Sequence, residues 1–133
     1  MIDADDSTEP PKPPPARKGL ARLIAAAGYS AAGIRAAFKS EEAVRMEIAA
    51  FIVMAPLGMW LGDGAIEKVL LVSCLVFVIV VELLNTAVEA VVDRFGGDYH
   101  ELSRVAKDIG SAAVFISLGL VIFIWAMLLL PSF

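Results

Sequence analysis

The stretch VLLVSCLVFVIVVELLNTAVEAVVD, residues 69–93, decides how this chain folds. It predicts a membrane-spanning helix, because about 20 predominantly apolar residues are enough to cross a bilayer. Two glutamates, Glu82 and Glu89, nevertheless lie inside it. A charged side chain at membrane depth costs about 2.5–3.5 kcal/mol on insertion scales, so such residues usually have a function. The stretch therefore predicts a membrane protein and a functional site together.

Glu82 and Glu89 are seven residues apart, and helical positions with this spacing share one face. Asn85 and Asp93 fall on the same stripe. Oxygen ligands suit a hard cation such as Mg²⁺, and a carboxylate in an apolar setting suits a general base. The alternative is structural, because polar side chains also join neighbouring membrane helices. Three acids and an amide on one stripe favour a functional site.

The composition indicates an integral membrane protein. The chain has 133 residues, of which 59% are hydrophobic, and this leaves room for three spans and little else. Cys74 is the single cysteine. A disulfide framework and a cysteine metal site are therefore excluded, and we expect Cys74 to be a packing residue.

The segments around the acidic helix define the rest of the expected fold. Residues 1–18 are acidic and then rich in proline, so we expect a disordered tail and no cleavable signal peptide. Residues 19–39 are amphipathic and interrupted by glycines, which predicts one or two short helices in the membrane interface. Ser40 is the expected N-cap of the next helix. Residues 19–133 thus form one all-α membrane domain, with spans at about 42–62, 65–95 and 101–130.

Lysine and arginine residues predict the orientation of the spans. Seven precede the first span and three lie between the second and third, whereas only Lys68 lies near the first hairpin turn. The positive-inside rule places the N-terminus and the second connection in the cytoplasm and the C-terminus on the periplasmic side. The acidic stripe then lies at the cytoplasmic end of the second span.

Further reactive groups are also predicted on the cytoplasmic side of the membrane. Lys107 shares a helical face with Ser103 and Ser111. Phosphoryl transfer depends on positioning and charge neutralisation. It therefore requires groups such as those found here, namely acids that bind a metal, a lysine and interfacial arginines. The location at a membrane surface suggests a lipid acceptor. The chain has neither a GxxxxGK[ST] loop nor the glycine-rich and HRD loops of protein kinases, so it would belong to neither common kinase class.

Residues 81–114, VELLNTAVEAVVDRFGGDYHELSRVAKDIGSAAV, closely resemble the signature region of the prokaryotic diacylglycerol kinase family. Residues 26–38, AAGYSAAGIRAAF, resemble the interfacial segment of that family. The resemblance implies a homotrimer of the bacterial inner membrane, in which each protomer has an amphipathic surface helix and three transmembrane helices. Active sites shared between protomers would transfer the γ-phosphate of MgATP to the primary hydroxyl of diacylglycerol, giving phosphatidic acid. No nucleic-acid partner is expected.

The resemblance also implies a role for individual residues. Glu82 would be the general base, and Glu41 and Glu89 would bind Mg²⁺. The nucleotide would be contacted by Arg22, Tyr29, Glu41, Glu89, Asp98, Tyr99, His100, Lys107 and Asp108. The lipid would be placed by Arg22, Ser30, Arg35, Asn85 and Ser111.

Two positions depart from the family pattern. Ala31 follows GYS, where family members often have an aromatic residue. The family's HELSGRAKD is HELSRVAKD in this chain, so the basic residue is Arg104, one position earlier. This shift turns the side chain by about 100° around the helix.

Two other functions fit parts of the sequence. A polyprenol kinase of the same fold would use the same chemistry. Related undecaprenol kinases, however, often have proline after the histidine and lack AAGYS, so diacylglycerol is favoured. A non-enzymatic membrane subunit or a proton-conducting bundle would use Glu82 and Glu89 as relay or packing groups. That alternative does not explain why Glu41, Lys107 and Asp108 are expected on the same side.

Overall fold

The computed structural model describes residues 18–94 and 99–130, and every regular element in these ranges is an α-helix. The helices are α1 (Leu20–Ser40), α2 (Glu42–Leu61), α3 (Ala65–Arg94) and α4 (Glu101–Leu129). Within the described ranges, three of them, α2, α3 and α4, are long and apolar enough to cross a membrane. An all-α fold with three candidate spans is therefore confirmed. The predicted tail lies outside the described residues, except for Lys18.

α1 is one continuous helix of 21 residues and not two short ones. Glycine is a weak helix former, by about 1 kcal/mol relative to alanine, but neither Gly28 nor Gly33 interrupts it. The chain divides into two units, residues 1–32 and 33–133, so the N-terminal part of α1 is described on its own. Its apolar side chains Leu20, Leu23 and Ile24 are exposed, as suits a helix that lies in a membrane interface.

The junction of α1 and α2 corrects one prediction. Ser40 does not cap α2, because it is the last residue of α1 and its hydroxyl donates to the carbonyl of Ala37 at 3.4 Å. Glu41 occupies the N-cap position without a side-chain capping bond. Arg45, in the first turn of α2, donates through Nη1 to the carbonyl of Phe38 at 3.1 Å. Carbonyls at a helix C-terminus lack intrahelical partners, so Arg45 ties the end of α1 to the start of α2.

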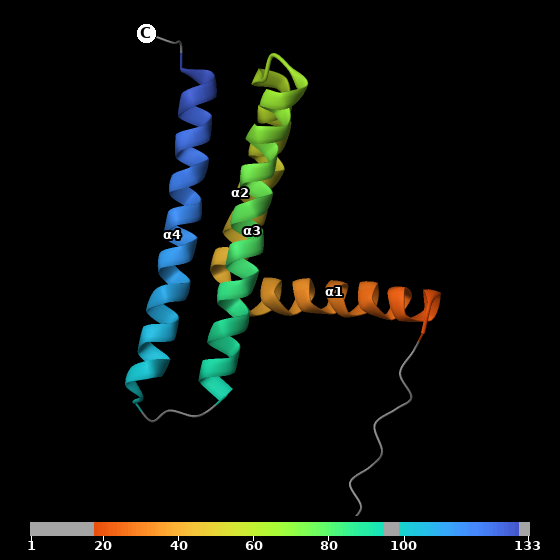
Figure 1. Cartoon of the computed structure of the whole chain (residues 1–133), viewed down its shortest axis with the longest axis vertical. Helices are drawn as coiled ribbons and strands as arrows, with labels where there is room; N and C mark the ends of the chain where they lie inside the picture. Colours follow the sequence, from red (N-terminus) through yellow and green to blue (C-terminus); the bar gives the residue numbers. More distant parts are fainter. Residues whose placement is uncertain (1–17, 95–98, 131–133) are drawn as a thin grey trace, which may run out of the picture. The chain divides into compact units, whose positions relative to one another are not determined.

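α3 packs against both α2 and α4 (Figure 1). The core cluster consists of Cys74, Leu75 and Val78 of α3 with Val121 of α4. Cys74 and Val78 are one helical turn apart and thus share a face. Cys74 is buried, which confirms its predicted role in packing. Helices in a bilayer associate through this kind of close packing, because lipid tails remove most of the hydrophobic driving force between them.

Trp125 and Gly58 bring the three helices together. The Trp125 indole Nε1 of α4 donates to the carbonyl of Leu71 in α3 at 3.2 Å. A Cβ at Gly58 of α2 would lie 3.1 Å from Leu71 Cβ and 3.4 Å from Trp125 Cζ2. Small residues allow membrane helices to approach closely, so Gly58 sets the spacing of α2 from its two neighbours.

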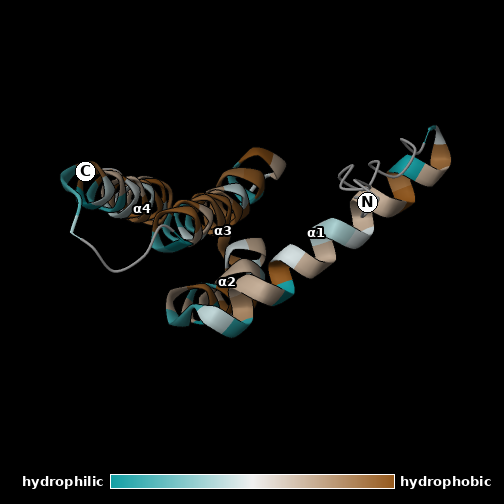
Figure 2. Ribbon diagram, turned by 90° about the horizontal axis from the view of Figure 1, so that it is seen from below, coloured by the Kyte–Doolittle hydropathy of each residue, from teal (hydrophilic) through white to brown (hydrophobic). Residues whose placement is uncertain are grey.

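Much apolar surface remains uncovered in a single chain. Figure 2 shows hydrophobic residues along most of α3. In the most apolar 18-residue window of each helix, 28% of the residues of α3 are buried, but only 11% of those of α2 and of α4. The outer faces of α2 and α4 are therefore suited to lipid or to a second copy of the chain.

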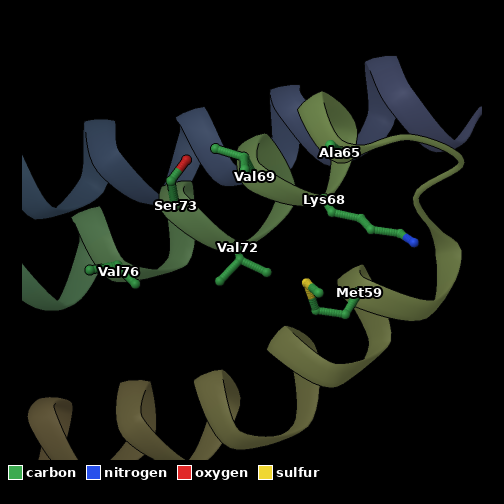
Figure 3. A pocket seen from close by; sticks show the side chains of 7 residues that line it. All are labelled: Met59, Ala65, Lys68, Val69, Val72, Ser73 and Val76. Carbon is green, nitrogen blue, oxygen red and sulfur yellow. The ribbon is translucent and has the colours of Figure 1, made fainter.

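An apolar groove of about 600 Å³ lies between α2 and α3, next to the turn that joins them (Figure 3). Met59 of α2 and Val72 of α3 face the same space in Figure 3, and Lys68 extends at one end. The groove is lined by Met59, Ala65, Lys68, Val69, Val72, Ser73 and Val76. None of these is a predicted site residue, and the acidic stripe lies further along α3.

We expect Gly58→Leu to lower the thermal midpoint of the protein in detergent. The new side chain must displace Leu71 and Trp125, and overpacking of this kind costs about 1–3 kcal/mol. Gly119→Leu is the matched control, because no described atom lies within 4 Å of a Cβ at that position. Thermal unfolding followed by circular dichroism compares the two variants. Equal midpoints would show that Gly58 does not set the helix spacing.

Candidate active site

Glu82 is the buried end of the acidic stripe. Glu82 is 5% exposed, and Ser117 is the only other buried polar residue among those described. Glu82 lies one turn beyond Val78 of the core cluster, and residues four apart share a helical face. The side chain is therefore carried inward by the same face of α3 that packs the core. A carboxylate in this position requires a compensating partner or ligand.

Three further carboxylates interact electrostatically with Glu82. Glu89 of α3 and Glu41, which precedes α2, are within electrostatic range of it. Glu47 of α2 is also within electrostatic range of Glu82. The Oε2 atom of Glu47 is buried, and no described group forms a hydrogen bond with it. Like charges repel, so a positive charge near these carboxylates would be stabilised.

Glu47 is the residue of this cluster that sequence analysis missed. It belongs to EEAVRME, residues 41–47, the charged segment that precedes the apolar run of the first span. The available signal was that Glu47 is the last acid before a long apolar run. Only the packing of α2 on α3 brings it to Glu82, and periodicity within one helix carries no information about that contact.

Asn85 orients one of the carboxylates. Its Nδ2 donates to Glu89 Oε1 at 3.2 Å, which confirms that these two members of the predicted stripe are neighbours. Its Oδ1 is buried, without a hydrogen-bond partner in the described part of the chain. This oxygen lies against Gly110 of α4, where an added Cβ would overlap it. Gly110 thus leaves the space in which Asn85 can face Glu89.

Lys107 connects α4 to the stripe. Its Nζ lies 2.6 Å from Asp93 Oδ1, and its charge also interacts with Glu89 and Glu41. Asp93 is the last acid of the stripe, so this ion pair joins the end of α3 to the first turns of α4. The side chains of Lys107 and Asp93 are 40% and 64% exposed. An ion pair this exposed adds little stability, so Lys107 can exchange Asp93 for an anionic ligand.

The other predicted residues of this region are exposed, namely Tyr99, His100, Asp108 and Ser111. His100 caps α4, because its Nδ1 accepts a hydrogen bond from the backbone N–H of Leu102 at 3.2 Å. This bond satisfies one of the free N–H groups at the start of the helix. Tyr99 and Asp108 are both bonded to charged side chains of α4.

The predicted site residues of α1 are also exposed, namely Arg22, Tyr29, Ser30 and Arg35. The Ser30 hydroxyl donates to the carbonyl of Ala26 at 3.0 Å, one turn back in the same helix. Arg22, Tyr29 and Ser30 belong to the N-terminal unit, so their part in the site stays a prediction. Asp98 lies outside the described residues.

The donor set suits a metal ion that arrives with its substrate. In residues 18–94 and 99–130, no group of three or more His, Cys, Asp or Glu side chains converges in a way that could hold a metal ion. Glu41 and Glu89 supply two carboxylates, and Mg²⁺ commonly takes one or two carboxylates together with substrate phosphates. The bond from Asn85, which orients Glu89, also fits a ligand role for that residue.

Comparison with known proteins identifies the family of the chain. Residues 28–129 match the family described as prokaryotic diacylglycerol kinase. The chain is 49% identical over 115 residues to the diacylglycerol kinase of Escherichia coli (strain K12). The aligned region covers 86% of this chain and 94% of that protein. It is 47% identical over 111 residues to the diacylglycerol kinase of Haemophilus influenzae, with 84% and 94% covered. For the diacylglycerol kinase of Pseudomonas aeruginosa the identity is 41% over 120 residues, with 90% and 98% covered. The chain therefore belongs to the prokaryotic diacylglycerol kinase family and is a membrane-bound kinase.

Proposed function

We propose that this protein transfers the γ-phosphate of ATP to the primary hydroxyl of diacylglycerol, giving phosphatidic acid and ADP. The observation that carries the proposal is the buried Glu82, which interacts electrostatically with Glu41 and Glu89. Lys107 supplies a cation to the same cluster. The names of the relatives, each a diacylglycerol kinase, support the choice of acceptor.

Glu82 acts as the general base in the proposed reaction. Its carboxylate takes the proton of the lipid hydroxyl while the hydroxyl oxygen forms a bond to the γ-phosphorus. The bond between the γ-phosphorus and the bridging oxygen breaks in line, and ADP leaves with that electron pair. One phosphoryl group and one proton move, so no covalent intermediate on the protein is required.

Glu41 and Glu89 are the proposed ligands of Mg²⁺. When bound, this ion neutralises negative charge that develops on the β- and γ-phosphates. Asn85 restricts the Glu89 carboxylate to one orientation through the bond from Nδ2 to Oε1. Gly110 supports the same geometry from α4 by leaving room for Asn85 Oδ1. Outer contacts of this kind usually alter metal affinity by about 10- to 100-fold.

The remaining predicted contacts divide between the two substrates. Lys107 leaves its exposed ion pair with Asp93 and binds the phosphate oxygens of ATP instead. The other nucleotide contacts are Arg22, Tyr29, Asp98, Tyr99, His100 and Asp108. The lipid contacts are Arg22, Ser30, Arg35, Asn85 and Ser111.

The proposed setting is the bacterial inner membrane, with the N-terminus in the cytoplasm and the C-terminus in the periplasm. The distribution of lysine and arginine supports this orientation. We also propose a homotrimer with active sites shared between neighbouring protomers. The uncovered apolar faces of α2 and α4 support burial against lipid and against other copies.

A polyprenol is the second candidate acceptor, because the same base and metal ligands would phosphorylate any primary lipid alcohol. The segment AAGYS, residues 26–30, and the names of the relatives favour diacylglycerol. A direct comparison of the two acceptors therefore belongs in the test of the proposal.

We expect Glu82→Gln to abolish phosphate transfer while the protein still assembles as a trimer, because glutamine keeps the shape of the side chain but cannot accept the proton. The assay uses protein purified in detergent, labelled ATP, Mg²⁺ and either diacylglycerol or undecaprenol. Glu67→Gln is the matched control, since Glu67 lies in the first turn of α3, where its carboxylate accepts from the Asp63 backbone N–H at 2.9 Å.

Label in phosphatidic acid that disappears in Glu82→Gln but persists in Glu67→Gln would support both the activity and the base. Label only in the polyprenol would show that the acceptor is a polyprenol and not diacylglycerol, with the proposed mechanism unchanged. Near-normal activity of Glu82→Gln would remove Glu82 as the base.

We expect Glu89→Ala to raise the Mg²⁺ concentration needed for half-maximal activity by about tenfold or more, because one of two carboxylate ligands is lost. Mg²⁺ titrations at fixed ATP and lipid measure the effect, again with Glu67→Gln as the control. An unchanged Mg²⁺ requirement would exclude Glu89 as a ligand.

Gly110→Ala should weaken Mg²⁺ activation in the same direction without removing a ligand. The added methyl group overlaps Asn85 Oδ1 and displaces the amide that orients Glu89. Gly119→Ala adds the same methyl group to α4 at a position with no described atom within 4 Å of it. If both alanine variants keep the Mg²⁺ dependence of the parent protein, Gly110 does not support the metal ligand.

A further inference from the structure

A network of charged side chains runs along the start of α4. The Tyr99 hydroxyl donates to Glu101 Oε2 at 2.6 Å. Arg104 donates two hydrogen bonds to the same carboxylate, from Nε to Oε2 at 3.2 Å and from Nη2 to Oε1 at 2.5 Å. Its third group, Nη1, donates to Asp108 Oδ2 at 2.6 Å. Arg104 therefore links Tyr99 to Asp108 through an unbroken series of hydrogen bonds.

The local sequence explains why this network forms. Glu101, Arg104 and Asp108 are spaced by three and four residues, so they lie on one face of the helix. The planar guanidinium presents several N–H groups in a fixed fork, so it can hold one carboxylate with two bonds and still reach a second. His100 caps the helix directly before Glu101 and orders the turn that carries it.

The network depends on the side chain at position 104. A glycine at this position would have no side chain to make these bonds. An arginine at position 105, where this chain has Val105, would point about 100° away around the helix.

We propose that Arg104 is a positioning residue for the nucleotide, which it serves by holding Tyr99 and Asp108 in place and by neutralising Glu101 and Asp108. This inference rests on the proposed function, which assigns Tyr99 and Asp108 to the nucleotide. Arg104 acts through these two residues and needs no direct contact with a substrate.

Charge is the main reason to expect an effect on nucleotide affinity. The described groups around Lys107 include several acids, namely Glu41, Glu89 and Asp93. Removal of Arg104 would leave Glu101 and Asp108 with unneutralised charge in the region that has to accept a triphosphate. The side chain of Arg104 is 50% exposed, and those of its two acidic partners are 59% and 62% exposed, so salt will screen the effect.

A purely structural role makes a different prediction. Exposed ion pairs on one helix contribute little to stability. If Arg104 only stabilised α4, its loss would slightly lower the thermal midpoint and leave the Michaelis constants for ATP and lipid unchanged. The separation of KM from kcat therefore distinguishes the two roles.

The test compares Arg104→Gln and Arg104→Lys with the parent protein as the full chain in detergent. We expect Arg104→Gln to raise KM for MgATP about three- to tenfold, with kcat changed by less than about twofold and KM for diacylglycerol unchanged. Arg104→Lys should recover part of the loss, because lysine keeps the charge but lacks the fork. The ratio of the KM values of Arg104→Gln and the parent protein should fall as the salt concentration rises.

Arg94→Gln is the matched control, since it removes the same charge from the last turn of α3 and Arg94 forms no ion pair with another described residue. An unchanged KM for MgATP in Arg104→Gln would overturn the proposal. An equal rise in Arg94→Gln would also overturn it, because net charge alone would then account for the effect. A fall in kcat at constant KM would assign Arg104 to the chemical step instead.

Titration with a non-hydrolysable ATP analogue separates this inference from the proposed function. If the parent protein binds the analogue but phosphorylates no lipid, the proposed function fails, and weaker binding by Arg104→Gln would still support the role of Arg104. If the parent protein phosphorylates diacylglycerol and both proteins bind the analogue equally, the inference alone fails.

Discussion

The structure depends on one constraint, that carboxylates placed within a membrane-spanning helix have to be kept away from lipid. α3 meets this constraint by packing between α2 and α4, so that the face carrying Cys74 and Val78 continues into Glu82. Glu41 and Glu89 interact electrostatically with the buried Glu82. An arrangement of this kind is costly unless cations complete it, and the proposed metal-nucleotide complex would provide them.

The same constraint explains how a chain of this size can bind a nucleotide without a phosphate-binding loop. Helices supply the scaffold, and single charged side chains at their ends are the proposed contacts. Lys107 pairs with Asp93 across α3 and α4, while Arg104 pairs with two acids along α4. These pairs are exposed and weak, so a phosphate group can replace one partner at little cost. Positioning and charge neutralisation are the main requirements of phosphoryl transfer.

Small residues determine how closely the helices approach, and this in turn sets the geometry of the site. Gly58 lets α2 lie against Leu71 and Trp125, and Gly110 lets α4 lie against Asn85. The second contact bears directly on chemistry, because the other end of the Asn85 amide holds Glu89. Gly58 thus acts on helix packing alone, whereas Gly110 acts both on the approach of α4 and on the orientation of Glu89, the proposed metal ligand.

The sequence by itself determined the helices, the three candidate spans and the adjacency of Asn85 and Glu89, because hydrophobic length and helical periodicity are local properties. The motif in residues 81–114 also determined the family. The N-cap predicted at Ser40 from local residue preference was wrong, because Arg45 bonds to the end of α1 and Glu41 occupies the cap position of α2. Only the tertiary structure decided that Glu47 approaches Glu82, that Gly110 meets Asn85 and that Lys107 pairs with Asp93. Each of these contacts joins two helices, and the pattern of one helix does not specify which face of another it will meet.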